Sequence, residues 1–208
     1  MKKKIISVLT VLAIIIGTVP LGIMPVFAAS SGTAVASTPA VRSSVTKSGT
    51  FTLTSAARLF IVSDADPTGS DLGTYVQTAS SVLAAKNIPT SSPLTIVYGR
   101  ESAAQAGDIV IRTDSSATGH RGGYVLDISA GGISITADDA EGVLYALTTL
   151  AQTCTSGTVL KCTTVTDWPD VAERSVYLDC GRIYFAPATL KALIRTMAWN
   201  RMNVLYLD

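Results

Sequence analysis

The sequence is short of the residues on which most metal and nucleophilic chemistry depends. It holds three cysteines and one histidine, and aromatic residues make up only 6% of the chain. The spacing of Cys154, Cys162 and Cys180 fits no zinc pattern, so neither a metal site nor another cofactor is predicted. His120 lies in the loop-like stretch TGHRGG, and no neighbouring motif supports a Ser-His-Asp triad. An exposed histidine without a chemical role is the expectation.

Charge is also scarce, and it is not concentrated in any segment beyond the first four residues. Charged residues make up 15% of the chain, with 16 Lys and Arg against 15 Asp and Glu. No basic patch argues for nucleic acid as a partner, and no polybasic run argues for anionic lipid. The sequence carries no signal for an oligomeric state.

The only long apolar run lies at the amino terminus. Lys2, Lys3 and Lys4 precede the mainly apolar segment Ile5 to Val19, and Val26-Phe27-Ala28 then provides the small residues of a cleavage site. This order is typical of a secretory signal peptide over residues 1–28, cut after Ala28. The run is shorter than the roughly 20 residues of a membrane span, so no stable span is expected after cleavage. The exported chain would be secreted or at the cell surface, with 180 residues and a net charge of −2, since only the three leader lysines are lost.

Export permits disulfide bonds, and two of the cysteines are candidates. Cys154 and Cys162 are eight residues apart, across a segment that reads as a hairpin or as a return from a helix to a strand. A bridge between them and a set of three buried free thiols are both consistent with this spacing.

Residues 29–50 are rich in Ser, Thr, Ala and Val without helical periodicity, and they are predicted to be a disordered leader. From Phe51 the pattern changes. Strands are predicted at 58–62, 95–98 and 108–112, and a helix at 72–86 with Leu72, Val76, Ala79 and Leu83 on one stripe.

The clearest pattern in the chain runs from 123 to 152. Apolar and polar residues alternate over 124–128 and 133–136 around Ala130-Gly131-Gly132, which predicts a β-hairpin. Asp138 or Asp139 is then expected to cap a helix, with Glu141 in its first turn. Its core stripe is predicted to contain Val143, Leu144, Leu147, Leu150 and Ala151. Residues 51–166 are therefore predicted to form one α+β domain, a sheet with packed helices.

A junction at 166–174 contains Pro169, which is unsuited to a central strand. A strand at 176–178, a helix from Pro187 to about Asn200 and a strand from Val204 follow. The helix is expected to bury a stripe made of Leu190, Leu193, Ile194, Met197 and Ala198. Such strand–helix–strand units repeat in α/β barrels. One unit cannot shield its own sheet, so its exposed apolar faces predict that more chain follows.

The order of these segments resembles that of the family 20 glycoside hydrolases, the β-N-acetylhexosaminidases and lacto-N-biosidases. The resemblance is carried by GYVLDISAGGISITADDAEGVLYALTTLAQ (123–152), DWPD (167–170), RSVYLDCGR (174–182) and MAWNRMNVLYL (197–207), and it covers about residues 50–208. It implies an accessory α+β domain over 51–166, followed at 167–208 by the first strand-helix-strand unit of a truncated (β/α)8 TIM barrel.

The resemblance also implies a chemistry. A retaining hydrolase of this family removes a terminal β-linked N-acetylhexosamine from an oligosaccharide or glycoconjugate, and the substrate's own acetamido oxygen is the nucleophile. An adjacent Asp-Glu pair runs the reaction, and that pair follows a later strand in the family. No catalytic residue is therefore assigned in this chain, and Asp138-Asp139 is attributed to helix capping. The chain alone is expected to be inactive.

One residue is assigned from the resemblance to substrate binding. Arg174 opens the R-x-x-x-L-D motif, and a planar guanidinium suits two neighbouring sugar hydroxyls. The alternative is an arginine at a domain junction, bonded to backbone carbonyls or to Asp170. Its position at the beginning of a strand is a difficulty, because barrel sites lie at the carboxyl ends. Asp179 and Arg182 are expected to form a local ion pair that holds the following loop, rather than to contact substrate.

The chain departs from the family at two positions. Many members carry histidines where this chain has Tyr206 and Asp208, which favours a divergent specificity such as release of lacto-N-biose. Two other functions are consistent with the sequence. A secreted, non-catalytic carbohydrate-binding or structural module would need exposed aromatics, for which Tyr75, Tyr98 and Tyr124 are the few candidates. An unrelated α/β-barrel enzyme with the same opening unit would lack the Asp-Glu pair.

Overall fold

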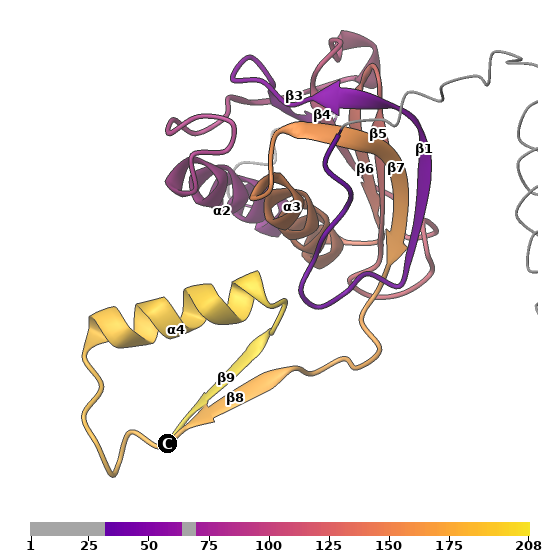
Figure 1. Cartoon of the computed structure of the whole chain (residues 1–208). Helices are drawn as coiled ribbons and strands as arrows, with labels where there is room; N and C mark the ends of the chain where they lie inside the picture. The colour runs from indigo at the N-terminus through magenta and orange to yellow at the C-terminus, as the bar shows by residue number, and fades with distance from the viewer. Residues whose placement is uncertain (1–31, 64–69) are drawn as a thin grey trace, which may run out of the picture.

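The computed structural model describes residues 32–63 and 70–208, which form a seven-stranded sheet with two helices and a smaller strand–helix–strand unit (Figure 1). The predicted signal peptide lies outside the described residues. Within them, no helix has the length and apolar character needed to cross a membrane. The elements in chain order are β1 Ser43–Thr52, β2 Leu59–Val62, α2 Asp71–Ala85, β3 Ile96–Gly99, a 3-10 turn Glu101–Ala103, β4 Ile109–Thr113, β5 Tyr124–Ser129, β6 Gly132–Ala137, α3 Ala140–Cys154, β7 Val159–Asp167, β8 Ser175–Leu178, α4 Pro187–Trp199 and β9 Val204–Leu207.

The large sheet is mixed, with the strand order β1-β7-β5-β6-β4-β2-β3. Strands β3, β2, β4 and β6 are parallel, whereas β5 pairs antiparallel with both β6 and β7. The predicted hairpin is confirmed as β5–β6, with Leu126 opposite Ile135 and Ile128 opposite Ile133. Because side chains alternate between the two faces of a strand, these four residues all point into the core, where each is at most 2% exposed.

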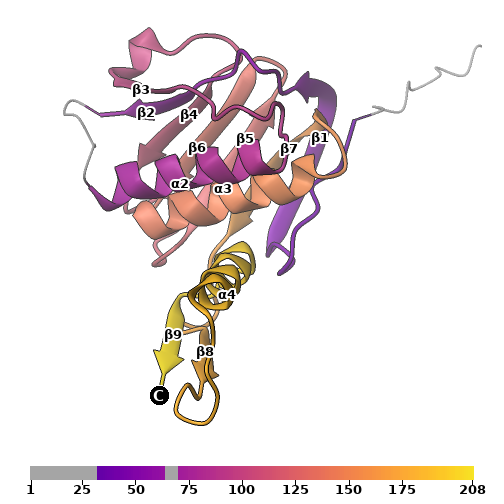
Figure 2. The same ribbon diagram turned by 90° about the vertical axis from the view of Figure 1, so that its left-hand side faces the viewer.

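Helices α2 and α3 lie side by side across one face of this sheet (Figure 2). The predicted helices and the strands over 58–62, 95–98 and 108–112 are confirmed within one or two residues. Val143, Leu147, Leu150 and Ala151 are buried against the sheet as expected. Leu144 was predicted to join them but is only partly buried, since it faces a cleft beside the smaller unit.

The prediction of a disordered leader at 29–50 is wrong for the part of it that the structure describes. Thr33 pairs with Leu160, and the backbone N–H of Thr38 donates to Gln152. Residues 43–50 form regular secondary structure. They belong to β1, which pairs antiparallel with β7 and shifts register between Thr46 and Thr50. The strand lies at the edge of the sheet and buries only Phe51. An edge strand that is exposed on both faces shows no alternation of apolar residues, so the pattern that reveals β5 and β6 is missing here.

All three cysteines, each within the described residues, are free thiols. Cys154 and Cys162 are buried, so the buried-thiol alternative describes them and the bridge is not formed. Burial raises the pKa of the Cys154 thiol to about 12. A thiol of that pKa stays protonated and is a small apolar core residue.

The smaller unit consists of β8, α4 and β9, with the two strands parallel and Ser175 opposite Val204. All three elements were predicted. The prediction of a buried stripe on α4 is wrong, because Met197 is the only buried residue of the helix and Ile194 is 51% exposed. Two strands are too narrow to cover a helix of this length, so most of its apolar side remains accessible.

Candidate functional site

Arg174, the residue predicted to bind sugar, is held by four hydrogen bonds of its guanidinium. Nε donates to the carbonyl oxygen of Arg201 at 2.7 Å, and Nη1 donates to that of Val171 at 2.6 Å. Nη2 donates to the hydroxyl of Tyr145 and, at 3.4 Å, to Oε1 of Glu141. Arginine has five N–H donors, so these contacts leave one.

These contacts are the ones expected of a junction arginine that bonds backbone carbonyls. Asp170, the alternative partner, pairs with Arg42 instead. The main-chain carbonyl of Arg174 accepts from the N–H groups of Asn203, at 2.9 Å, and Val204, at 3.3 Å. Arg174 therefore lies at the amino ends of both parallel strands. Its role in sugar binding stays a prediction.

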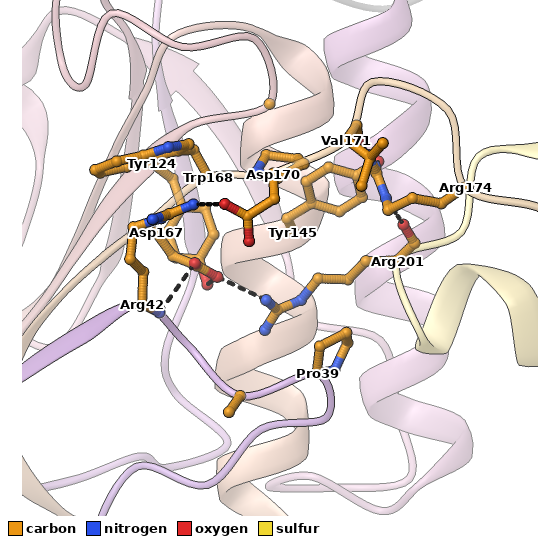
Figure 3. Close-up of a pocket in the computed structure, with 13 residues that line it drawn as sticks. Pro39, Arg42, Tyr124, Tyr145, Asp167, Trp168, Asp170, Val171, Arg174 and Arg201 are labelled. Carbon is orange, nitrogen blue, oxygen red and sulfur yellow. Dashed lines mark hydrogen bonds and ion pairs between the residues drawn. The ribbon is translucent and has the colours of Figure 1, made fainter.

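A cleft of about 270 Å³ separates the large sheet from the start of the smaller unit (Figure 3). At its centre the carboxylate of Asp167 accepts from Arg201 Nη1 at 2.7 Å and from the hydroxyl of Tyr124 at 3.1 Å. Its other oxygen accepts from the backbone N–H of Arg42 at 3.1 Å. Trp168 forms part of the wall, and the guanidinium of Arg42 lies 4.3 Å from its ring centre. The walls therefore mix aromatic faces with paired charges.

Glu141 connects α3 with the smaller unit. It accepts from Tyr145 within its own helix, from Arg121, and from Nδ2 of Asn203 at 3.2 Å. Burial alone would raise the pKa of Glu141, but the hydrogen bonds from Tyr145 and Asn203 and the charge of Arg121 outweigh it and lower the pKa. Burial and the bond to Glu141 raise the pKa of Tyr145. Glu141 is thus an ionised anchor, whereas the sequence suggested only a favourable place in the first helical turn.

The adjacent pair Asp138-Asp139 has structural partners that explain both residues. Asp139 is the residue before α3 and accepts from the backbone N–H of Gly142 at 2.8 Å, which confirms the predicted cap. Asp138 does not cap the helix. It accepts from the backbone N–H groups of Thr118 and Gly119 and so holds the loop before β5.

The carboxyl ends of β8 and β9 carry a second group of polar residues. Asp179 Oδ1 accepts from the backbone N–H groups of Gly181, at 3.0 Å, and Arg182, at 3.1 Å, while Oδ2 pairs with Arg182 Nε at 2.9 Å. The predicted local ion pair is confirmed. The Arg182 side chain is nevertheless 90% exposed, so its two Nη groups are accessible to a ligand.

Tyr206 and Asp208, the two departures from the family pattern, each find a partner. The hydroxyl of Tyr206 donates to Oε1 of Glu173 at 2.9 Å, and Asp208 accepts from the hydroxyl of Tyr177 at 2.5 Å. His120 stacks on Trp168 with 4.4 Å between ring centres. Of these residues, Trp168 lines the same cleft as Arg174. Sequence separation conceals such groupings, since Arg174 and Glu141 are 33 residues apart.

The chain superposes on solved structures of β-N-acetylhexosaminidases. The chain superposes with a TM-score of 0.64 and 25% identity on Streptomyces plicatus N-acetyl-beta-hexosaminidase in complex with Thio-NAglucal, covering 82% of this chain and 34% of that one. The GH20 beta-N-acetylhexosaminidase of Streptomyces coelicolor A3(2) gives the same values. The beta-N-acetylhexosaminidase of Bacteroides fragilis NCTC 9343 matches at a TM-score of 0.62 and 23% identity, covering 81% of this chain and 32% of that one.

The chain thus spans about a third of the length of these enzymes. A search of curated proteins finds no match. The family model for glycosyl hydrolase family 20, domain 2, matches residues 35–168, which are most of the chain and contain the whole large sheet. This protein therefore belongs to glycosyl hydrolase family 20.

Proposed function

We propose that this chain is the amino-terminal part of a secreted, retaining exo-glycosidase that removes β-linked N-acetylhexosamine or lacto-N-biose units by substrate-assisted catalysis. Family membership over 35–168 supports the class of enzyme. One Streptomyces plicatus relative is in complex with its product GlcNAc, which supports a GlcNAc-type substrate. The exported chain begins at Ala29, and amino-terminal sequencing of material from the culture medium tests this.

The domain division is part of the same proposal. Residues 51–166, together with β1, form the accessory domain, and residues 167–208 begin a (β/α)8 barrel. The supporting observation is the parallel β8–α4–β9 unit, which directly follows the matched domain and leaves much of α4 uncovered. Parallel strands joined by a helix are the repeating unit of such barrels.

Isolated residues 29–208 will not turn over substrate. In the family the reaction requires an adjacent Asp-Glu pair, and the one adjacent acidic pair, Asp138-Asp139, is committed to a helix cap and a loop. Release of nitrophenol from an aryl N-acetyl-β-glucosaminide or an aryl lacto-N-bioside is the measurement. Turnover above a buffer blank would overturn the proposal for this chain.

The geometry favours Arg182 over Arg174 as the sugar contact. Barrel active sites lie at the carboxyl ends of the strands. Arg182 follows that end of β8, and Asp179 holds its Nε so that the planar guanidinium is oriented for two hydroxyls. Arg174 lies at the opposite end of β8. Its Cα is roughly 16 Å from that of Asp179, since a strand rises about 3.3 Å per residue.

Two substitutions in the complete enzyme separate these assignments. We expect Arg182→Met to lower kcat/KM for an aryl N-acetyl-β-glucosaminide by about 100-fold, the loss of two charged hydrogen bonds. Arg174→Met should lower thermal stability while kcat/KM changes by less than about 10-fold. The reverse pattern would restore the role predicted for Arg174 from the motif.

The non-catalytic module receives less support from the structure. Of its three candidate aromatics, Tyr124 is 1% exposed and bonded to Asp167, so it cannot form a platform for sugar rings. Tyr98 is 48% exposed and remains the best candidate. We expect calorimetric titration of residues 29–208 with chito-oligosaccharides to show no binding. Binding that is lost in Tyr98→Ala would support the carbohydrate-binding module.

A further inference from the structure

The β8–α4–β9 unit is ordered although it has almost no core of its own. Among residues 168–208, only Met197 and Arg201 are buried. A sheet of two strands is marginally stable without other support. Contacts with the part of the chain that carries the large sheet (residues 32–63 and 70–167, called the first domain below) therefore help to hold the unit. Trp199 packs against the apolar core of the first domain, and the other contacts described here are polar.

Arg201 lies at the turn between α4 and β9 in a conformation that disfavours arginine. Its φ is +58°, in the left-handed region. The N–H of Met202 bonds the carbonyl of Met197, and that of Arg201 bonds the carbonyl of Ala198. This is a Schellman helix end, where glycine or asparagine is usual at the left-handed position.

Helix α2 ends in the same motif, which makes the choice of arginine informative. Asn87 occupies the left-handed position there, with φ +57°, and Ile88 N–H bonds the carbonyl of Leu83. Asn87 is exposed, whereas Arg201 is 7% exposed. The backbone motif is therefore identical in the two helices, and only the side chain of Arg201 is committed to a buried position.

The Arg201 guanidinium enters the first domain and bonds three of its side chains. Nη1 donates to Asp167 Oδ2 at 2.7 Å, and Nη2 donates to Thr149 Oγ1 at 2.6 Å and to Ser37 Oγ at 2.5 Å (Figure 3 shows Arg201 and Asp167). Asp167 is 6% exposed. Removing the Arg201 side chain would leave the buried carboxylate of Asp167 without a counter-charge, which is strongly unfavourable.

The receiving groups are held by the first domain itself. Asp167 is fixed by the backbone N–H of Arg42 and by the hydroxyl of Tyr124, and Thr149 lies on α3. A second contact lies next to this one, because Gln152 Nε2 donates to the carbonyl of Trp199 at 2.7 Å. Lys86, at the end of α2, places its ammonium 4.5 Å from the centre of the Trp199 ring.

We propose that Arg201, with Asp167, Thr149 and Ser37, forms a lock that holds the β8–α4–β9 unit on the first domain. The unit docks by inserting one arginine into a polar socket prepared by α3 and the end of β7. The order of β9 and α4 then depends on this guanidinium in addition to the apolar contacts of Met197 and Trp199. The proposal concerns the joint between the two parts and stands whether or not the chain belongs to an active glycosidase.

Arg201→Gly in the full chain tests the lock, with Asn87→Gly as the matched control. Glycine fits the left-handed backbone at both positions, so the substitutions differ in the loss of the buried guanidinium. We expect amide hydrogen exchange in α4 and β9 to rise at least about 100-fold in Arg201→Gly, as for a broken buried pair. Exchange in β5 and β6 should not change. Asn87→Gly should leave α4 and β9 unaltered.

Tryptophan quenching gives an independent measurement. The chain has two tryptophans, so Trp168→Phe leaves Trp199 as the single reporter beside the lock. In that background Arg201→Gly should make Trp199 more accessible to acrylamide. Asp167→Asn should release the unit as well, and adding it to Arg201→Gly should have little further effect, because both remove the same interaction.

Two outcomes would overturn the proposal. Unchanged exchange in α4 and β9 of Arg201→Gly would show that the guanidinium does not hold the unit. Equal loss of protection in β5 and β6 would make Arg201 a residue of the first domain's own core rather than a lock. If Arg201→Gly fails to fold, Arg201→Lys serves in its place. Lysine keeps the positive charge but has no planar guanidinium whose two Nη atoms can bond Asp167 and Thr149 at the same time.

Discussion

The first domain and the β8–α4–β9 unit are stabilised by different means. The first domain has a continuous apolar core between its sheet and the helices α2 and α3, and this core includes Leu126, Ile135 and Leu147. The smaller unit buries only Met197 and Arg201. The comparison separates a part with its own apolar core from a part that buries little and contacts its neighbour through Arg201, Gln152 and Trp199.

The largest effect is expected from the apolar core. Ile135→Ala removes a fully buried side chain in the middle of β6 and should lower the free energy of unfolding by about 3–4 kcal/mol. Because the smaller unit depends on the first domain, both parts should lose structure in the same denaturant transition. Separate transitions, followed by Trp199 fluorescence and far-ultraviolet circular dichroism, would show that the unit folds without its framework.

A smaller effect is expected from the single buried apolar residue of α4. Met197→Ala should cost about 2 kcal/mol, the lower end for a buried methionine, since much of its surroundings is accessible. The loss should appear as faster amide exchange in α4 and β9, while the midpoint of the first domain's unfolding is unchanged. A fall in that midpoint comparable to that of Ile135→Ala would contradict the division into two parts.

The smallest effect concerns an ion pair that belongs to the first domain alone. Asp108 is buried and accepts from Arg58 Nε at 2.8 Å and Nη2 at 2.5 Å, and the hydrogen bond from Arg58 lowers the pKa of Asp108. An acid with a lowered folded pKa stabilises the protein above its unfolded pKa of about 3.9, and this contribution is lost as the pH falls through the folded value.

Asp108→Asn should therefore cost about 1 kcal/mol at pH 7 and reduce the loss of stability below about pH 4. Urea unfolding at pH 7 and pH 3 measures both. The order of α4 and β9 at pH 7 should be unaffected, because Asp108 lies outside the lock. A variant that keeps the wild-type slope between pH 7 and pH 3 would show that this pair does not carry the acid sensitivity.

Local patterns predicted most elements of the fold. The hairpin 124–136 was recognisable because one face of each strand is buried, and α3 because its cap and its apolar stripe coincide. The edge strand β1 was missed because only Phe51 on it is buried, so its composition resembled a flexible leader. On α4 the helix was predicted but its buried stripe was wrong, because whether an apolar stripe is covered depends on neighbours outside the helix.

The candidate site was harder to predict than the fold. The Asp179–Arg182 pair was predicted because its members are three residues apart. For Arg174, bonds to backbone carbonyls were one of the two alternatives, but its contacts with Tyr145 and Glu141 were not predicted. No partner was predicted for Arg201. The one available signal was an arginine two residues after Trp199, the last residue of the helix, at a position where glycine or asparagine is usual.

The sequence by itself determined the types of the elements, most of their order, and the family to which the chain belongs. These depend on periodicity, capping and the succession of motifs, which are properties of neighbouring residues. The tertiary structure decided which charges meet. Arg201 bonds Ser37, which is 164 residues away, and whether a guanidinium faces solvent, sugar or a buried carboxylate depends on how distant segments pack. Long-range electrostatic pairing leaves no local pattern, because the energy of a charge depends on its surroundings in space.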